Sequence, residues 1–410
     1  MKVLIACDSF KDCMTSMEAG MAAREGVLRI CPDAEITVCP VADGGEGTVE
    51  ALCGGVNGVA STIHNQKETE STNEWTNAYG AICRTIVVTG PLGDRIHAEY
   101  VIIDKGDYKL AVLEMAAAAG LMLVPKENRN PMHTTTYGVG EMIRDAIDQG
   151  CSSFIIGIGG SATNDGGIGM LQALGYRFVD AHGEDVAFGG DGLCKLQDIY
   201  FEDVMPRLRR CTFKIACDVD NPLLGETGCT YTFAKQKGAT DDSISVMEIG
   251  MKRYADLVEH MAICDEGPVT SNFRRNYPGA GAAGGIGYAF LMFLNAQLRP
   301  GVDIIFDELC LEERIKKVDI ILTGEGKTDS QTVHGKTPYG VAKLAKKHGK
   351  RVYLFSGCVT ADAKRLEEEG AFDGIYAITP QDMPMEDAIR KDIAMRNMTE
   401  TVAEKLIIKG

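Results

Sequence analysis

The sequence of 410 residues lacks a C-x-x-C pair and any apolar run approaching the ~20 residues that span a bilayer. Its 14 cysteines are scattered, so no zinc-type spacing occurs, and a disulfide framework is implausible in a long chain without an export signal. The opening MKVLIACDSF has only a short apolar run, which predicts a β-strand rather than a signal peptide. We therefore expect a cytoplasmic protein with reduced thiols.

Basic residues are also scarce. The chain has 42 Lys and Arg against 58 Asp and Glu, which gives a net charge of −16 and a pI of about 5.0. This balance argues against a nucleic-acid-binding face, which needs clustered positive charge. An anionic small molecule remains compatible, because a local group of lysines can override the global sign. We expect small-molecule substrates, with neither nucleic acid nor membrane as a partner, and the sequence does not give the oligomeric state.

Several common catalytic signatures are missing. Neither H-E-x-x-H nor G-x-S-x-G occurs, which removes the commonest metalloprotease and esterase patterns. The segment TGEGKTD contains a GKT, but a P-loop needs a glycine five residues before Gly326, and Ile321 stands there. The stretch GIGGSA likewise gives no dinucleotide-binding fingerprint.

Short apolar strands alternate with helical stretches, which is typical of a parallel sheet covered on both faces. Strands are predicted at both chain ends, in KVLIACDSF, EITVCPVADGG, VDIILTGEG, RVYLFSGCV and DGIYAITP. The middle differs, because RTIVVTGPLGDRIHAEYVIID predicts an antiparallel hairpin. The α/β chain is therefore expected to have one domain from residues 1–60 and 285–410 and an inserted mixed α/β domain from 61–284. The polar stretch near 61–80 is interpreted as a surface excursion.

The stretch IIGIGGSATNDGGIGM is rich in glycine. Six of the fifteen residues from Ile156 to Met170 are glycine, and they follow an apolar strand and precede a helix. Exposed amides at such a turn bind anions, and glycine allows their close approach. The candidate binding residues are Gly159, Gly160, Ser161 and Asn164, with Asp165 beside them for a metal or a proton.

A second glycine cluster, PGAGAAGGIG, contains Gly284 and Gly285 and precedes an apolar helix. It favours either a phosphate loop or close helix packing. After CTFKIACDVDNPL, Asp218 is a candidate magnesium ligand, with an Asn-Pro turn as the equal alternative.

Carboxylates and lysines follow two strands near the N-terminus. DSFK supplies Asp8, Ser9 and Lys11, and ADGGEG supplies Asp43 with the glycines at 44 and 45. Because ligands bind beyond the carboxyl ends of parallel strands, these groups suit phosphoryl chemistry. From TGEGKTDSQTVHGKTPYG, Glu325 and Asp329 are expected to face the same ligand, along with Ser330, Lys336 and Thr337.

Taken together, the motifs resemble the type I glycerate kinase family in both sequence and order. They are DSFK, PVADGGEGT, TGPLGD, LEMAAAAGL, TTTYGVGEMI, IGIGGSATNDGGIGMLQALG, CDVDNPLLGETG, QKGA, PGAGAAGGIG and TGEGKTDSQTVHGKTPYGVA. The resemblance implies a Rossmann-like domain made of both chain ends, a second α/β domain inserted between them, and an active site in the cleft. It implies ATP-dependent phosphorylation of D-glycerate, generally on the 2-hydroxyl.

The roles that follow are hypotheses. Asp43 or Asp165 would orient or deprotonate the hydroxyl, and Lys11 would bind phosphate or the substrate carboxylate. Phosphate and substrate contacts are expected from Asp8, Ser9, Gly44, Gly45, Gly159, Gly160, Ser161, Asn164, Gly284, Gly285, Glu325 and Asp329, and Mg²⁺ contact from Asp218. The division between ATP-binding and glycerate-binding loops stays open.

Two departures from the family pattern leave alternatives. Asp12 stands where DSFKG is usual, and Ala234 and Lys235 replace the Gly-Pro of F-G-P-Q-K-G. They motivate a kinase for another small hydroxy acid as the first alternative. The second is a non-catalytic protein of the same fold that senses a nucleotide or metabolite.

Overall fold

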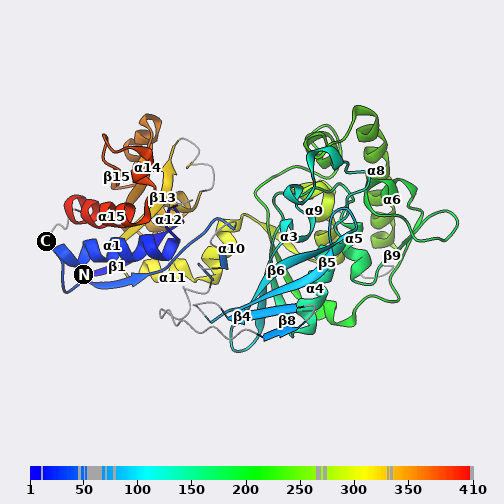
Figure 1. Cartoon of the computed structure of the whole chain (residues 1–410), viewed down its shortest axis with the longest axis horizontal. Coiled ribbons are helices and arrows are strands. Elements are labelled where there is room, and N and C mark those ends of the chain that lie inside the picture. The colour runs from blue at the N-terminus through cyan, green and yellow to red at the C-terminus, as the bar shows by residue number, and fades with distance from the viewer. Residues whose placement is uncertain are drawn as a thin grey trace. The chain divides into compact units, whose positions relative to one another are not determined.

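The computed structural model divides the chain into two compact units. The described residues are 1–10, 13–44, 48–49, 51–52, 67–69, 72–76, 80–264, 269–270, 275–329, 332 and 336–406. Unit 1 comprises residues 1–62 and 300–410, and unit 2 comprises residues 63–299 (Figure 1). Each unit is described by itself.

The second boundary lies at 299/300 rather than at the expected 284/285. Helix α9 (Ala282–Phe293) belongs to unit 2, because its apolar side chains are buried in the core of that unit. The ring of Phe290 in α9, for example, lies 6.3 Å from that of Phe213 in strand β11 (Thr212–Ala216). An apolar helix beside a boundary gives no sign in the sequence of which core it enters.

Unit 1 contains a parallel sheet that joins the two chain ends. Its strands are β1 (Lys2–Cys7), β2 (Glu35–Val38), β13 (Ile320–Thr328), β14 (Arg351–Val359) and β15 (Gly374–Ala377). In the described residues the order is β15–β14–β13–β1–β2, with every neighbouring pair parallel. Val3 pairs with Ile320 on one side and Ile36 on the other. The α/β prediction for both chain ends is confirmed.

Helices cover this sheet. They are α1 (Ser16–Ile30), α10 (Gly301–Glu308), α11 (Leu311–Lys316), α12 (Thr337–Lys347), α13 (Arg365–Glu368), α14 (Met385–Ala388) and α15 (Lys391–Lys405), with a 3₁₀ turn at Ala361–Lys364. Thr15 starts α1 through a capping box with Glu18. Helices α1 and α15 lie side by side (Figure 1), and Gly26 allows this approach, since a Cβ there would lie 2.6 Å from the Thr399 carbonyl oxygen. Val27 and Met398 are fully buried in the core beneath them.

Unit 2 is built on a mixed sheet. Its strands are β3 (Lys67–Thr69), β4 (Thr72–Thr76), β5 (Ile82–Thr89), β6 (Arg95–Asp104), β7 (Lys109–Glu114), β8 (Cys151–Gly157), β11 and β12 (Gln297–Arg299). In the described residues the order is β12–β11–β8–β7–β6–β5–β4–β3, parallel from β12 to β7 and antiparallel beyond. A separate antiparallel pair joins β9 (Arg177–Val179) and β10 (Asp198–Tyr200). The expected hairpin is β5–β6.

Besides α9, the helices of unit 2 are α3 (Ala116–Ala119), α4 (Tyr137–Asp148), α5 (Ile168–Ala173), α6 (Gly189–Lys195), α7 (Cys229–Phe233) and α8 (Asp241–Ile263). Short 3₁₀ turns occur at Leu121–Leu123, Lys126–Asn128, Pro206–Arg210 and Lys235–Lys237. Across the described part of the chain, no helix is both long and apolar enough to cross a membrane.

The described part of residues 61–80, which was interpreted as a surface excursion, forms two strands at the end of the sheet, and Trp75 is exposed there. Lys67–Thr69 and Thr72–Thr76 are strands β3 and β4, and Trp75 pairs with Cys83 of β5. Strand pairing uses backbone groups, so a polar edge strand needs no apolar pattern to join a sheet.

Candidate active site

A cavity of about 830 Å³ opens at the carboxyl ends of the unit 1 strands. Polar side chains reach it from three places: Asp8 and Ser9 after β1, Asp43 after β2, and Glu325 and Lys327 of β13. Lys336, the residue before α12, completes this polar part. The sequence predicted this meeting at the sheet edge, because the strands are parallel and end together.

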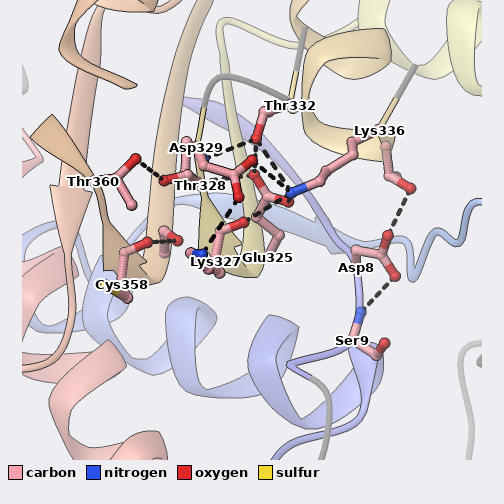
Figure 2. A network of polar contacts seen from close by, with 12 residues as sticks. Asp8, Ser9, Glu325, Lys327, Thr328, Asp329, Thr332, Lys336, Cys358 and Thr360 are labelled. Carbon is pink, nitrogen blue, oxygen red and sulfur yellow. Dashed lines mark hydrogen bonds and ion pairs between the residues drawn. The ribbon is translucent and has the colours of Figure 1, made fainter. Parts of the chain in front are cut away.

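Asp8 is held in place by two donors. Its carboxylate accepts hydrogen bonds from the Ser9 amide at 2.7 Å and from the Thr337 hydroxyl at 2.6 Å (Figure 2). Desolvation in the cavity raises the pKa of Asp8 to about 6, the two hydrogen bonds oppose this, and the charges of Asp43 and Glu325 add to it. Asp43 and Glu325 therefore each lie close enough to Asp8 to repel its charge.

Glu325 forms the centre of a second group of contacts. One carboxylate oxygen accepts from Thr328 at 2.8 Å and from Thr332 at 2.9 Å. The other lies 3.3 Å from the ammonium of Lys336, which also reaches Asp329 at 3.4 Å. Figure 2 shows Lys336 extended toward both carboxylates. Burial raises the pKa of Glu325, against the lowering effect of Lys336. Lys336 and Glu325 thus border one cavity, whereas Asp329 pairs with Lys336 without being among the lining residues.

Asp43 and Gly44 follow strand β2 in a bend. Gly44 adopts a φ of 99°, in the left-handed region that favours glycine. A Cβ on Gly301, at the start of α10, would lie 2.1 Å from the Asp43 carbonyl oxygen, so only glycine there permits this approach. The bend is therefore held against a helix start, which positions Asp43 at the cavity. Lys11 and Gly45, both expected nearby, lie outside the described residues.

Most of the remaining cavity wall is apolar, which the sequence reasoning did not anticipate. Phe10, Ile378, Met383, Met385 and Ile389 are among the residues that line it. Four of these come from the segment between β15 and α15, where no motif marks them. The only signal in the sequence was the recurrence of apolar residues in a segment otherwise rich in charge and proline.

The glycine-rich stretch of residues 157–169, called the glycine loop below, lies in unit 2. It has an open part and a packed part. A Cβ on Gly159 would meet nothing within 4 Å, and one on Gly160 would meet only Ala116 at 3.7 Å. By contrast, a Cβ on Gly167 would lie 2.6 Å from Ala289 and one on Gly169 2.3 Å from Thr135. Two glycines thus leave backbone accessible to a ligand, and the later ones serve close packing.

Asp165 is enclosed by hydrogen-bond donors of its own unit, and its expected role in proton transfer stays a prediction. The side chain is 0% exposed, and its two oxygens accept from the amide and hydroxyl of Thr136 and from the amide of Gly167, at 2.8–3.0 Å. Burial raises its pKa, and these hydrogen bonds oppose that rise. A carboxylate so enclosed ties the loop to the start of α4.

Gly284 and Gly285 also pack rather than face a ligand. A Cβ on Gly284 would lie 2.0 Å from the Thr163 carbonyl oxygen, and the Gly166 amide donates to the Gly284 carbonyl at 2.9 Å. Both glycines are buried and have positive φ. The second glycine cluster therefore supports the first loop, and the packing alternative is the one that the structure favours.

Lys237 is the functional candidate that sequence reasoning missed. It is 2% exposed and donates hydrogen bonds at 2.7 Å to the Ser161 hydroxyl and to the Thr163 carbonyl oxygen. Burial lowers its pKa to about 8, although the nearby Cys229 and Asp165 raise it. Its motif QKGA was noticed only as part of the family pattern. Lys237 places a positive charge directly beneath the glycine loop.

Two polar atoms near Lys237 lack partners. Asn164 donates to the Thr230 hydroxyl at 3.2 Å, but its own side-chain oxygen and the Thr163 hydroxyl have no hydrogen-bond partner among the described residues, although both are buried. Such atoms are rare in folded proteins and often mark a functional place. They support the loop as a binding element.

Asp218 lies exposed after β11. In the described ranges no three His, Cys, Asp or Glu residues are grouped so that they could hold a metal ion. Its role as a magnesium ligand stays a prediction.

Comparisons with known proteins agree with these features. The chain matches the model of the glycerate kinase family over residues 3–407. It is 43% identical to a Bacillus subtilis (strain 168) protein named glycerate kinase, covering 95% of this chain and 93% of that protein. It is 40% identical to an Escherichia coli (strain K12) protein named glycerate 2-kinase, covering 98% of each.

The fold agrees as well. A crystal structure of a Salmonella typhimurium LT2 protein, described as a candidate glycerate kinase 2, superposes with a TM-score of 0.81 at 40% identity. It covers 98% of this chain and 96% of that one. The chain therefore belongs to the glycerate kinase family of enzymes.

Proposed function

We propose that this enzyme transfers the γ-phosphoryl group of ATP to the 2-hydroxyl of D-glycerate and releases 2-phosphoglycerate. The observation that carries the proposal is the cavity in which Asp8, Asp43 and Glu325 meet Lys336. Phosphoryl transfer needs positioning and charge neutralisation more than covalent chemistry, and carboxylates beside a lysine supply both. The name of the Escherichia coli relative, glycerate 2-kinase, supports the choice of hydroxyl.

Asp43 is our choice for the group that orients and deprotonates the acceptor hydroxyl. It lines the cavity, its charge lies close enough to Asp8 to raise the pKa of Asp8, and the approach that Gly301 permits holds its bend in place. Lys336 and Lys327 would bind phosphate oxygens, and Lys11 stays a further prediction for that role. The exposed backbone at Gly159 and Gly160 would bind an anionic oxygen of the acid, with Lys237 beneath it. That both ligands meet in one cleft stays a prediction.

The carboxylates of the cavity fit Mg²⁺. The ion is usually held by one or two carboxylates together with phosphate oxygens, so a larger protein cage is unnecessary. Burial is the main cause of the raised pKa of Asp8, and the nearby charges of Asp43 and Glu325 add to it; a bound cation would offset both effects. Asp8 and Glu325 are the residues that would hold it, and the ion would neutralise charge on the phosphates. Lys336 would then keep the same phosphates close to the strand ends.

The departures from the family pattern do not favour another acid as the substrate. Lys235 is exposed and pairs with Asp241 at 3.1 Å, whereas Ala234 is buried against Met247. The Lys237 ammonium donates to Ser161 and to Thr163 rather than to either of these residues. Asp12 lies outside the described residues.

We also place the activity in the cytoplasm. The donor proposed here is ATP, and the thirteen cysteines that the structure describes are free thiols, which suits a reducing compartment.

The test is consumption of ATP by the purified full chain with Mg²⁺ and a panel of small hydroxy acids. We expect D-glycerate to give the highest kcat/KM, with lactate and glycolate far below it. An equal or higher kcat/KM with another acid would show that D-glycerate is not the preferred substrate. An intact protein that consumes no ATP with any acid would favour the sensor alternative.

A further inference from the structure

The cavity of unit 1 has two ends of different chemistry. At one end Asp8, Glu325 and Lys336 border the strand ends, and at the other Ile378, Met383 and Met385 form an apolar wall. D-glycerate carries an oxygen on every carbon, so it has no surface that would cover such a wall. The apolar end therefore calls for a larger ligand that has one flat apolar part and one anionic part.

The apolar wall is also open to solvent. Met385 is 74% exposed and Ile389 is 43% exposed, and both line the cavity at helix α14. Large apolar side chains beside a cavity, when left in water, are typical of a ligand site. The exposed Gln381 lies on the same rim, and its amide can both donate to and accept from the edge of a heterocyclic base.

The position of the polar end sets the direction of the ligand. Among the described residues that line the cavity, Lys336 and Lys327 carry positive charge. They lie at the carboxyl edge of the parallel sheet, where phosphates bind in related architectures. A cavity of about 830 Å³ lies within the size range of pockets that enclose whole small-molecule ligands. A purine nucleotide has a flat apolar base and anionic phosphates, so its two parts match the chemistry of the two ends.

We infer that unit 1 by itself forms the nucleotide site, with the purine base against Ile378, Met383 and Met385 and the phosphates at Lys327 and Lys336. This inference rests on the proposed function for the identity of the nucleotide. The sequence did not show which loops bind ATP and which bind glycerate. If unit 1 binds the nucleotide, the glycine loop of unit 2 is the element that would bind the acid.

Cysteine reactivity tests the location without any substitution. Cys358 is exposed and lines the cavity, whereas Cys264 and Cys310 are exposed and do not line it. The full-length protein is treated with iodoacetamide, and the alkylation rate of each cysteine is followed by mass spectrometry with Mg²⁺–ADP, with D-glycerate, or with neither. We expect Mg²⁺–ADP to slow alkylation of Cys358 about tenfold or more while Cys264 and Cys310 keep their rates, and we expect D-glycerate alone to protect none of them.

A substitution tests the orientation. Ala388→Trp fills the apolar end, and Ile249→Trp, on the exposed face of α8 in unit 2, is the matched control. We expect Ala388→Trp to raise the KM for ATP about tenfold or more with the KM for D-glycerate unchanged, and Ile249→Trp to change neither. If Ala388→Trp does not fold, the cysteine measurement on the unaltered protein still decides.

The outcomes separate this inference from the proposed function. Protection of Cys358 by Mg²⁺–ADP without formation of phosphoglycerate supports the nucleotide site and removes the proposed reaction. Turnover of ATP and D-glycerate with an unprotected Cys358 and an unchanged KM for ATP keeps the reaction and overturns the site. Absence of both protection and turnover overturns both.

Discussion

Lys237 donates a hydrogen bond of 2.7 Å to the hydroxyl of Ser161, from a side chain that is only 2% exposed. The same ammonium reaches the Thr163 carbonyl oxygen at 2.7 Å, so one buried cation connects the 3₁₀ turn after α7 to the glycine loop. The charge lies beneath the backbone at Gly159 and Gly160, which is the part of the loop that a ligand can approach. Lys237 is thus a positioning residue that acts through the loop.

Lys237→Met should lower kcat/KM for D-glycerate about tenfold or more, which corresponds to ~1.4 kcal/mol of binding in the transition state. The substitution removes the charge and leaves two buried oxygens without their donor. Lys235→Met is the matched control, because Lys235 is exposed and makes only a surface ion pair. Steady-state kinetics on the three proteins measures the difference. An equal effect of both substitutions would show that burial of the lysine is irrelevant.

The protonation of Lys237 should appear in the pH dependence of stability. Its pKa is about 8 in the folded chain against 10.5 ordinarily, so between these values the folded state has released a proton that the unfolded state retains. The free energy of unfolding of the unaltered protein should therefore rise with pH across this window, relative to Lys237→Met, by up to about 1.4 kcal/mol per pH unit. Urea unfolding at pH 8, 9 and 10 gives both curves. Parallel curves would mean that the folded lysine keeps its ordinary pKa.

Asp165→Asn should act on stability. The amide cannot replace a carboxylate that accepts from Thr136 and Gly167, and one donor would face the NH₂ group. We expect a loss of about 1–3 kcal/mol in the free energy of unfolding. Asp191→Asn, which breaks only a partly exposed pair with Lys195, should change it by less than about 0.5 kcal/mol. An Asp165→Asn protein of unchanged stability but reduced turnover would instead support the predicted catalytic role of Asp165.

Asp43→Asn should remove most of the activity and leave the fold intact. A general base contributes about 10²–10⁴ in rate, so kcat should fall within that range while the KM values change little. The control is Asp33→Asn in an exposed turn of the same unit. Turnover equal to that of the unaltered protein would remove Asp43 from the chemistry.

The strands of both chain ends and the meeting of Asp8 with Glu325 were predictable, because both follow from local patterns and from the geometry of parallel sheets. Asp165 was not. It lies among small polar residues, as a catalytic aspartate would, but two of its donors come from Thr136, twenty-nine residues earlier in the chain. Gly284 misled in the same way, since the backbone that it packs against lies at Thr163. Burial through distant partners is invisible to a local pattern.

For Lys237 and strand β4, by contrast, the polar sequence gave no sign of the ordered structure that the fold shows. Two lysines spaced two residues apart are typical of a solvated turn. Only the fold shows that the Lys237 side chain is buried whereas that of Lys235 is exposed. Residues Thr72–Thr76 have the composition of a loop but pair with β5 through their backbone. The sequence of a polar segment says little about whether it is buried. Its hydrogen bonds can be satisfied by other protein groups when it is buried and by water when it is exposed.

The most direct test of the central claim is the product. The purified full chain is incubated with ATP, Mg²⁺ and D-glycerate, and the phosphorylated acid is identified by ³¹P NMR from its coupling to neighbouring protons. A phosphorus coupled to a single proton identifies 2-phosphoglycerate, which is the predicted result. Coupling to the two protons of a CH₂ group would assign the 3-hydroxyl and contradict the proposed acceptor, and no phosphoglycerate from an intact protein would contradict the reaction itself.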